Sequence, residues 1–288
     1  MTTPPLRSVL ADLSLDHHPT TRFTSGSLPV HAVGDDLVLK FYPAEDADEA
    51  QVEAAVLGAL EGRLSVTTPR LEAIGTAGGW HYTLMRRVPG LGLDTVWDTL
   101  SPTERRTLCA DVGEVTAELH AVGDRPAALD QDWSEFVRGR REAAAGHHRR
   151  QGLAPEWLDL IPAFLDDVDL STVSPVLLHT ELLHEHVLVR HDGKRWAVSG
   201  LIDFEPVMTG APEYEFVAAS VYLAEGDPAG WRGFLRGYGY QAHPGEAFAR
   251  RCLAYTVLHR YSSLRRYLEW MPLPAKPSLD ELAVLWFG

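Results

Sequence analysis

Apolar and polar positions are spaced differently in the two parts of the chain. Before Pro89-Gly90, short apolar runs alternate with turn residues, which is typical of strands half buried in a sheet. Strands are predicted over residues 21–24, 28–33, 37–42, 69–74 and 80–88. Residues 75–79 are expected to form the last turn, and helices are predicted over residues 6–13 and 46–60. The first third is therefore expected to be mainly β.

After Pro89-Gly90 the spacing becomes mainly helical. Ser101 is a predicted N-cap, with Pro102 at the first helical position and Glu104 at the third, so a helix should run to about His120. Further helices are predicted over residues 132–150, 155–168, 214–223, 231–238, 244–268 and 279–287.

This change from strands to helices at a Pro-Gly break indicates a domain hinge. We therefore predict one domain over residues 1–88 and a second over residues 89–288. The length of 288 residues and the composition, 45% apolar and 23% charged, suit a globular protein with a sizeable core.

Residues 176–205 interrupt the helical region with apolar strands that carry acidic and imidazole side chains at their ends. An Asp192-Gly193 turn predicts a β-hairpin, which brings the end near His186 close to the end at Asp203. With Glu181 nearby, a candidate base and two candidate metal ligands converge. That combination suits metal-assisted group transfer.

The formal charge of −14 disfavours nucleic acid as a partner, because its phosphates would be repelled. Cationic or neutral small molecules are favoured instead. The charge is uneven, because residues 201–230 hold six acidic side chains and no lysine or arginine. This segment is either a solvated acidic face or the floor of a cleft that binds metal and a cation.

Several features point to the cytoplasm. Cys109 and Cys252 lack metal or redox spacing, so both are expected to be reduced core residues. The N-terminus shows no basic region followed by an apolar one, and no apolar run is long enough to span a membrane.

Lys40 and Glu53 are candidate partners in the N-terminal part. Lys40 stands among apolar residues of a strand, and Glu53 flanks the apolar stripe of the following helix. Taken singly, each has a plain interpretation, as an edge lysine and a solvated flank. The turn at residues 25–27 is either an ordinary hairpin turn or a backbone cradle for phosphate.

The order and spacing of these motifs resemble a known family. The residues read His179-x-Glu181-Leu182-x-x-x-His186, then two strands, then Ile202-Asp203-Phe204. This is similar to the signature of the aminoglycoside phosphotransferase and choline kinase-like family, His-x-Asp-Leu-x-x-x-Asn followed by Ile-Asp-Phe or Ile-Asp-Trp. The resemblance covers roughly residues 20–288, and residues 248–286 look like hygromycin-type phosphotransferases.

The resemblance implies an α+β, bilobal protein-kinase-like fold. A small antiparallel sheet with one helix would form the N-lobe, and a mainly helical C-lobe would hold the catalytic loop and substrate pocket. ATP or GTP would lie between them, with Lys40 on the phosphates and Glu53 holding Lys40. The other nucleotide contacts implied are Ser25, Gly26 and Ser27 over the phosphates, and the backbone of Arg86 and Val88 at the nucleobase.

The resemblance also implies catalytic roles. Asp203 and the residue at position 186 would hold Mg²⁺, or Mn²⁺, and the residue at position 181 would orient and deprotonate the acceptor hydroxyl. Three positions depart from the family pattern: Glu181 replaces Asp, His186 replaces Asn, and Glu215 replaces Asp. The longer Glu181 moves the carboxylate, and imidazole suits transition metals better than Mg²⁺.

These departures leave alternatives open. The chain is either an active phosphotransferase or a catalytically altered kinase-like protein that binds nucleotide or ligand without phosphoryl transfer. His179, His184 and His186 also permit a third hypothesis, a hydrolytic metal centre.

The acceptor is expected to be a small hydroxylated molecule. The carboxylates and aromatic rings in the expected pocket region suit an amine-bearing ligand; they are Glu205, Glu213, Trp231 and Trp270. The aromatic residues could equally be helix core, and the basic C-terminal helices leave an anionic substrate open. We therefore expect an O-phosphotransferase that transfers a γ-phosphoryl group to a natural product such as an aminoglycoside or another antibiotic.

Overall fold

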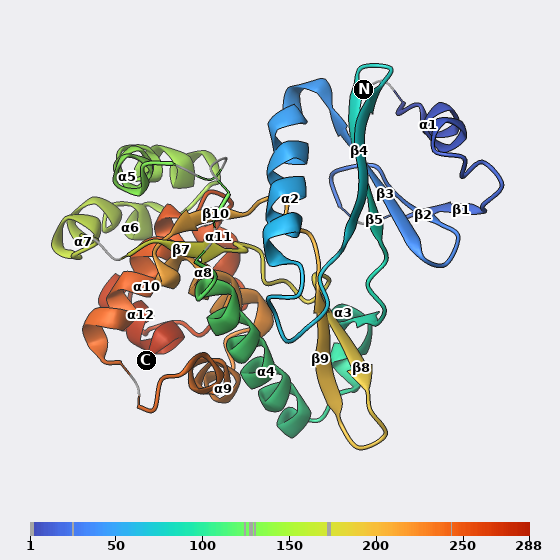
Figure 1. Ribbon diagram of the computed structural model, residues 1–288. Coiled ribbons are helices and arrows are strands. Elements are labelled where there is room, and N and C mark those ends of the chain that lie inside the picture. The colour runs from blue at the N-terminus through green and yellow to red at the C-terminus, as the bar shows by residue number, and fades with distance from the viewer. Residues whose placement is uncertain are drawn as a thin grey trace.

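The computed structural model describes residues 3–24, 26–123, 125–126, 129, 131–171, 174–242 and 244–288. In this part of the chain the strands of the N-terminal third and the later helices occupy two adjoining bodies (Figure 1). The fold is α+β and bilobal, as expected from the sequence. The exact boundary at residue 88 stays a prediction.

The N-terminal body is built on a five-stranded antiparallel sheet with the strand order β1-β2-β3-β5-β4. The strands are β1 (Thr20–Arg22), β2 (Val30–Val33), β3 (Leu37–Pro43), β4 (Leu71–Ala77) and β5 (Trp80–Arg86). Two consecutive glycines with positive φ, Gly78 and Gly79, connect β4 to β5. The backbone of such a two-residue turn suits the right-handed twist of the two strands that it joins. Because only two residues form the turn, β4 continues to Ala77, and the turn predicted over residues 75–79 was too long.

Side chains alternate along β3, so the two faces of this sheet carry different residues and are covered by different helices. Leu39 and Phe41 point to one face, where they pack with Val9 and Leu10 of α1 (Leu6–Asp12). The opposite face is covered by α2 (Ala47–Leu60), which follows the short 3-10 helix η1 (Ala44–Asp46). Lys40 therefore points toward α2, where its ammonium group meets Glu53.

The hairpin predicted after His186 forms the second sheet. It consists of β8 (Val187–His191) and β9 (Trp196–Leu201), with β6 (Leu91–Gly92) added along β8. A separate pair joins β7 (Val176–Leu178) to β10 (Met208–Gly210). The sequence analysis missed β6 and β10 because two or three residues carry no periodicity, and their partners lie far away in the chain.

The helix start predicted at Ser101 is confirmed in α4 (Pro102–His120). The Ser101 hydroxyl accepts from the Glu104 N–H while the Glu104 carboxylate accepts from the Ser101 N–H, which completes a capping box. This helix packs against α9 (Pro228–Tyr238). A Cβ on Gly113 would lie 2.2 Å from the carbonyl oxygen of Phe234, so glycine is what permits this close crossing.

The remaining helices complete the C-terminal body: α3 (Leu93–Val96), η2 (Trp97–Thr99), α5 (Trp133–Arg150), α6 (Pro155–Leu158), α7 (Ile161–Asp167), α8 (Pro212–Ala218), η4 (Ala219–Leu223), α10 (Glu246–Leu258), α11 (Leu264–Tyr267) and α12 (Leu279–Phe287). Two long predictions were wrong. Residues 155–168 are divided between α6 and α7, because Pro162 opens a new helix. Residues 244–268 are divided because His259 leaves helical geometry, at φ −57° and ψ 138°.

One apolar core runs from α2 through the C-terminal body and buries both cysteines. Among the described residues, no helix combines the length and the hydropathy needed to cross a bilayer.

Candidate active site

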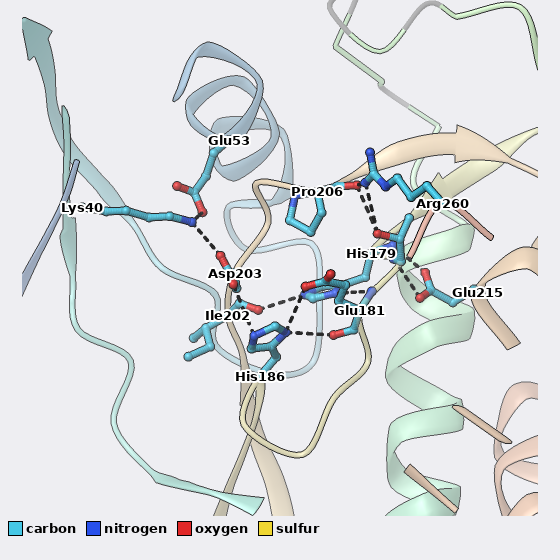
Figure 2. Close-up of polar contacts among 11 residues, drawn as sticks. Lys40, Glu53, His179, Glu181, His186, Ile202, Asp203, Pro206, Glu215 and Arg260 are labelled. Carbon is cyan, nitrogen blue, oxygen red and sulfur yellow. Dashed lines mark hydrogen bonds and ion pairs between the residues drawn. The ribbon is translucent and has the colours of Figure 1, made fainter. Parts of the chain in front are cut away.

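Lys40 and Asp203 meet between the two bodies. The Lys40 Nζ lies 2.6 Å from Asp203 Oδ1 and 3.4 Å from Glu53 Oε1 (Figure 2). Alternation along β3 and the position of Glu53 on α2 predicted that Lys40 and Glu53 would meet, and they do. The end of β9 adds Asp203, so a basic side chain from the early sheet faces an acidic one from the late hairpin.

The charges in this group reinforce one another. Burial would lower the pKa of Lys40, but the carboxylates of Glu53 and Asp203 outweigh burial and raise the pKa well above its ordinary value. Burial would raise the pKa of Asp203, but Lys40 and His186 lower it. Glu53 also accepts a hydrogen bond from the Tyr42 hydroxyl. At neutral pH Lys40 is therefore a cation and Asp203 an anion.

Glu215 holds the loop that precedes Glu181. Its carboxylate accepts hydrogen bonds from the backbone N–H groups of His179, at 2.5 Å, and Thr180, at 2.9 Å. Thr180 and Asp203 both have left-handed backbones, with φ of 70° and 69°. Such conformations cost energy in residues with side chains, and they tend to gather at functional sites. Glu215 therefore supports this loop from the position at which the family pattern has an aspartate.

His179 fastens the same loop to the strand that ends at Asp203. Its Nε2–H donates to the carbonyl of Ile202 at 2.9 Å, and burial lowers the pKa of its imidazole. His184 points to another part of the structure. The centroid of its ring lies 4.1 Å from that of Trp97, and its Nε2 lies 3.0 Å from the carbonyl oxygen of Leu223. The three imidazoles do not converge, which removes the geometric basis for a three-histidine metal centre.

His186 lies between Glu181 and Asp203. Its Nδ1 is 3.0 Å from the carbonyl oxygen of Glu181, and its Nε2 is 3.2 Å from Asp203 Oδ2 (Figure 2). The Glu181 carboxylate is 4.0 Å from His186 Nδ1. In the described part of the chain, Glu181, His186 and Asp203 form the one group of acids and histidines close enough to hold a metal ion.

The electrostatics of Glu181 differ from those of Asp203. Burial, and next the charge of Asp203, raise the pKa of Glu181, although His186 opposes them. A carboxylate with a raised pKa is a better proton acceptor near neutral pH than an ordinary glutamate. The position of Glu181 therefore suits a general base.

A cavity of about 290 Å³ opens beside Glu181. Its lining includes carboxylates and tyrosines: Glu181, Glu185, Glu225, Tyr222, Tyr261 and Tyr267. Trp270 is 42% exposed and lies against Tyr222 and Tyr267, with ring centroids 6.2 and 5.7 Å apart. The sequence analysis missed the tyrosines, because nothing in their spacing distinguishes a cavity wall from a core.

The four predicted substrate residues fall in different places. Trp231 is 2% exposed and packs on Phe234 and Phe287 in the core. Glu213 is buried and forms an ion pair with Arg251 at 3.1 Å. Neither residue lines the cavity, so neither is kept in the site proposed below.

Glu205 lies near Lys40, Asp203 and Glu49, and Trp270 lies against two tyrosines of the cavity lining. Burial raises the pKa of Glu205 to about 8, and a hydrogen bond to the Glu49 carboxyl group on α2 acts in the same direction. The Glu205 carboxyl group is therefore largely protonated at neutral pH.

The predicted nucleotide-binding residues lie along the N-terminal body. Gly26 and Ser27 are exposed between β1 and β2, and Ser25 lies outside the described residues. Arg86 ends β5, with its N–H donating to the Arg70 carbonyl and its side chain paired with Glu72. Val88 is buried on the connection toward β6. Backbone contacts to a nucleobase stay a prediction.

Arg260 holds two loops of the site together, a role that the sequence analysis did not predict. Its guanidinium donates to the carbonyl of Pro206 and, at 3.3 Å, to the hydroxyl of Thr180. It thereby ties the loop before Glu181 to the loop after Asp203. No sequence signal marked this contact, because it depends on where α10 ends.

The chain belongs to the phosphotransferase enzyme family, whose model matches residues 20–252. No curated protein sequence matches it significantly.

Solved structures share the fold at low sequence identity. An aminoglycoside 2′-phosphotransferase-IIIa in complex with GDP is 19% identical, covers 96% of this chain and 97% of its own, and gives a TM-score of 0.72. The macrolide 2′-phosphotransferase MphH from Brachybacterium faecium is 21% identical, with coverages of 88% and 89% and a TM-score of 0.63. APH(3″)-Id from Streptomyces rimosus is 17% identical, with coverages of 88% and 96% and a TM-score of 0.64.

Proposed function

We propose that the protein is a nucleotide-dependent O-phosphotransferase that acts on a hydroxyl group of a small natural product, such as an aminoglycoside or another antibiotic. The observation that carries this proposal is the 2.6 Å contact between Lys40 and Asp203 across the two bodies. A cation and an anion positioned this way suit the two ends of a triphosphate and its metal. Family membership and the kinase-like fold support the same reaction class.

Nucleotide binding is proposed to separate this ion pair. Lys40, held by Glu53, would contact the α- and β-phosphates, and Asp203 would turn to a divalent ion together with His186. When bound, such an ion neutralises negative charge on the phosphate oxygens. Solved relatives bound to GDP, ADP and ATP support a purine nucleotide as donor.

The remaining nucleotide contacts are proposed from the sequence. The turn with Ser25, Gly26 and Ser27 would cover the phosphates, and the backbone of Arg86 and Val88 would hold the nucleobase. Gly26 has a φ of 89°, a conformation that glycine adopts readily, and the absence of a Cβ lets its backbone approach a ligand closely. The N-terminal body over residues 1–88 would thus bind nucleotide, and residues 89–288 would bind the acceptor.

Glu181 is proposed as the general base. It lines the cavity and lies beside His186, so it can reach an acceptor hydroxyl placed near Asp203. The acceptor oxygen would form a bond to the γ-phosphorus while the bond from that phosphorus to the β–γ bridging oxygen breaks. The hydroxyl proton would pass to the Glu181 carboxylate, and the nucleoside diphosphate would leave.

The cavity supports an amine-bearing acceptor. Its lining combines Glu185 and Glu225 with tyrosine rings, which attract cations through charge and through ring faces. Among the solved relatives, kanamycin, gentamicin and streptomycin are bound to aminoglycoside phosphotransferases. Trp270 would extend the aromatic surface at the edge of the cavity.

Replacement of Asp203 tests the proposed function. Asp203→Ala should abolish phosphoryl transfer from ATP or GTP to a panel of aminoglycosides and macrolides, because the metal-binding carboxylate is lost. The matched control is Asp159→Ala, an exposed residue between α6 and α7. Circular dichroism should show both variants folded. Full activity of Asp203→Ala would refute the assignment.

The alternative, a kinase-like protein that binds without transfer, draws on one observation. Asp203 Oδ1 is already paired with Lys40 at 2.6 Å, so a metal ion would have to compete with this ion pair for the carboxylate. Calorimetric nucleotide binding without transfer to any acceptor in the panel, with either Mg²⁺ or Mn²⁺, would favour that alternative.

A further inference from the structure

The hydrogen bond at one ring nitrogen of His186 determines whether the other nitrogen carries a hydrogen or a lone pair. Nδ1 lies 3.0 Å from the carbonyl oxygen of Glu181, and a carbonyl oxygen can only accept. Nδ1 therefore carries the hydrogen. In the neutral ring this leaves the lone pair on Nε2, which lies 3.2 Å from the carboxylate oxygen Oδ2 of Asp203. In the neutral ring two acceptors therefore face each other, and a cation between them, either a proton on Nε2 or a metal ion, satisfies both.

The separation of these two atoms fits one metal ion. Two neighbouring ligands of an octahedral ion, each about 2.1 Å from it, lie about 3 Å apart. The observed 3.2 Å between Nε2 and Oδ2 is close to that value. The Glu181 carboxylate lies in reach of the same place, because one possible ligand atom from each of the three residues lies within 4.8 Å of the other two.

The donor set also decides which ion is favoured. Mg²⁺ takes oxygen ligands in nearly ideal octahedral geometry and rarely accepts imidazole. First-row transition ions bind imidazole nitrogen together with carboxylate oxygen, and the bond from Nδ1–H to a carbonyl orients the ring as metal-binding histidines require.

We propose that His186 Nε2 and Asp203 Oδ2, with the Glu181 carboxylate in reach, form a site that binds a divalent first-row transition ion through nitrogen and prefers it to Mg²⁺. The proposal deepens the proposed function, in which a divalent ion accompanies the nucleotide. It nevertheless requires neither nucleotide nor turnover. A failure to bind metal is therefore distinguishable from a failure of phosphoryl transfer.

Manganese is a suitable probe because its electron spin reports both binding and ligand type. The metal-stripped full-length protein is titrated with Mn²⁺, without nucleotide, and free Mn²⁺ is followed by electron paramagnetic resonance. Electron spin-echo envelope modulation of the bound ion then detects a directly coordinated ¹⁴N nucleus. We expect one Mn²⁺ per chain, clear ¹⁴N modulation, and displacement by Mg²⁺ only in large excess.

Two asparagine variants separate ligation from general effects. His186→Asn should remove the ¹⁴N modulation and weaken Mn²⁺ binding by about 10-fold or more, since even indirect partners of a metal typically contribute about 10–100-fold. His191→Asn, at the exposed far end of β8, should retain both signals. Mn²⁺ binding without ¹⁴N modulation, no Mn²⁺ binding, or unchanged affinity in His186→Asn would each overturn the proposal.

Discussion

The site has a proposed phosphate side, around Lys40 and Asp203, and a proposed acceptor side, around Glu181 and Glu205. These two sides treat charge in opposite ways. Lys40 is compensated by two carboxylates, and this pairing raises the pKa of Lys40 and lowers that of Asp203. Glu181 and Glu205 have raised pKa values, chiefly because burial is not fully offset by a cation. Around Lys40 and Asp203 the charges are therefore set before any ligand binds. Around Glu181 and Glu205 a cationic ligand would stabilise the carboxylates and favour the loss of their protons.

The largest effect should come from breaking the compensated side with Lys40→Met. The change leaves Glu53 and Asp203 facing each other without a cation, so we expect about 3–5 kcal/mol less stability toward urea. Loss of the phosphate ligand should also lower kcat by about 10²–10³-fold. The exposed control Lys276→Met should change neither quantity. Wild-type turnover in Lys40→Met would mean that Lys40 does not contact the nucleotide.

The second largest effect is expected from changing Glu181 and His186, the two residues near the proposed acceptor site that differ from the family pattern. The double variant Glu181→Asp, His186→Asn restores the family residues in a loop shaped for the longer side chain. If the site is tuned to its own residues, kcat should fall by about 10²-fold, since a misplacement near 1 Å costs that much. An increase in kcat would show instead that Glu181 and His186 are losses rather than adaptations.

A pH effect should follow from Glu205. Its folded-state pKa of about 8 lies above the unfolded value of about 4.3, so between these values the folded state binds the additional proton. The stability it contributes is present at low pH and is lost as the pH rises toward 8. The melting temperature of the wild type should therefore fall, relative to Glu205→Gln, across this window. The exposed control Glu114→Gln should run parallel to the wild type, and parallel curves for Glu205→Gln would contradict the prediction.

The smallest effect should come from the edge of the cavity. Trp270→Ala removes an exposed ring, so KM for the acceptor should rise about 2- to 10-fold while kcat is kept. Trp231→Ala provides the contrast, because a buried ring of the same type should cost about 3–5 kcal/mol of stability. Equal effects of the two variants on KM would place both residues in the pocket, against the observed burial.

The phosphate side could be predicted because each of its residues follows from a local rule. Alternation fixed the face of Lys40, helical spacing placed Glu53 beside the apolar stripe, and the hairpin turn brought Asp203 next to His186. Each of these rules applies within a short segment of the chain. The contacts of Lys40 with Glu53 and of Asp203 with His186 are those that the rules predict.

The acceptor side could not be predicted as fully, because it depends on how separate helices pack. The sequence does not reveal that the Trp231 ring packs against Phe234 and Phe287. Nor does it reveal that α10 ends before His259, which lets the Arg260 side chain reach the carbonyl of Pro206. An aromatic residue at helical spacing has the same pattern whether its ring fills a core or lines a cavity.

The most direct test of the central claim is a crystal structure with a non-hydrolysable ATP or GTP analogue and Mn²⁺. We predict that the Lys40–Asp203 contact is replaced, with Lys40 Nζ about 3 Å from an α- or β-phosphate oxygen and Asp203 on the metal. A nucleotide bound elsewhere, with Lys40 and Asp203 still 2.6 Å apart, would contradict it.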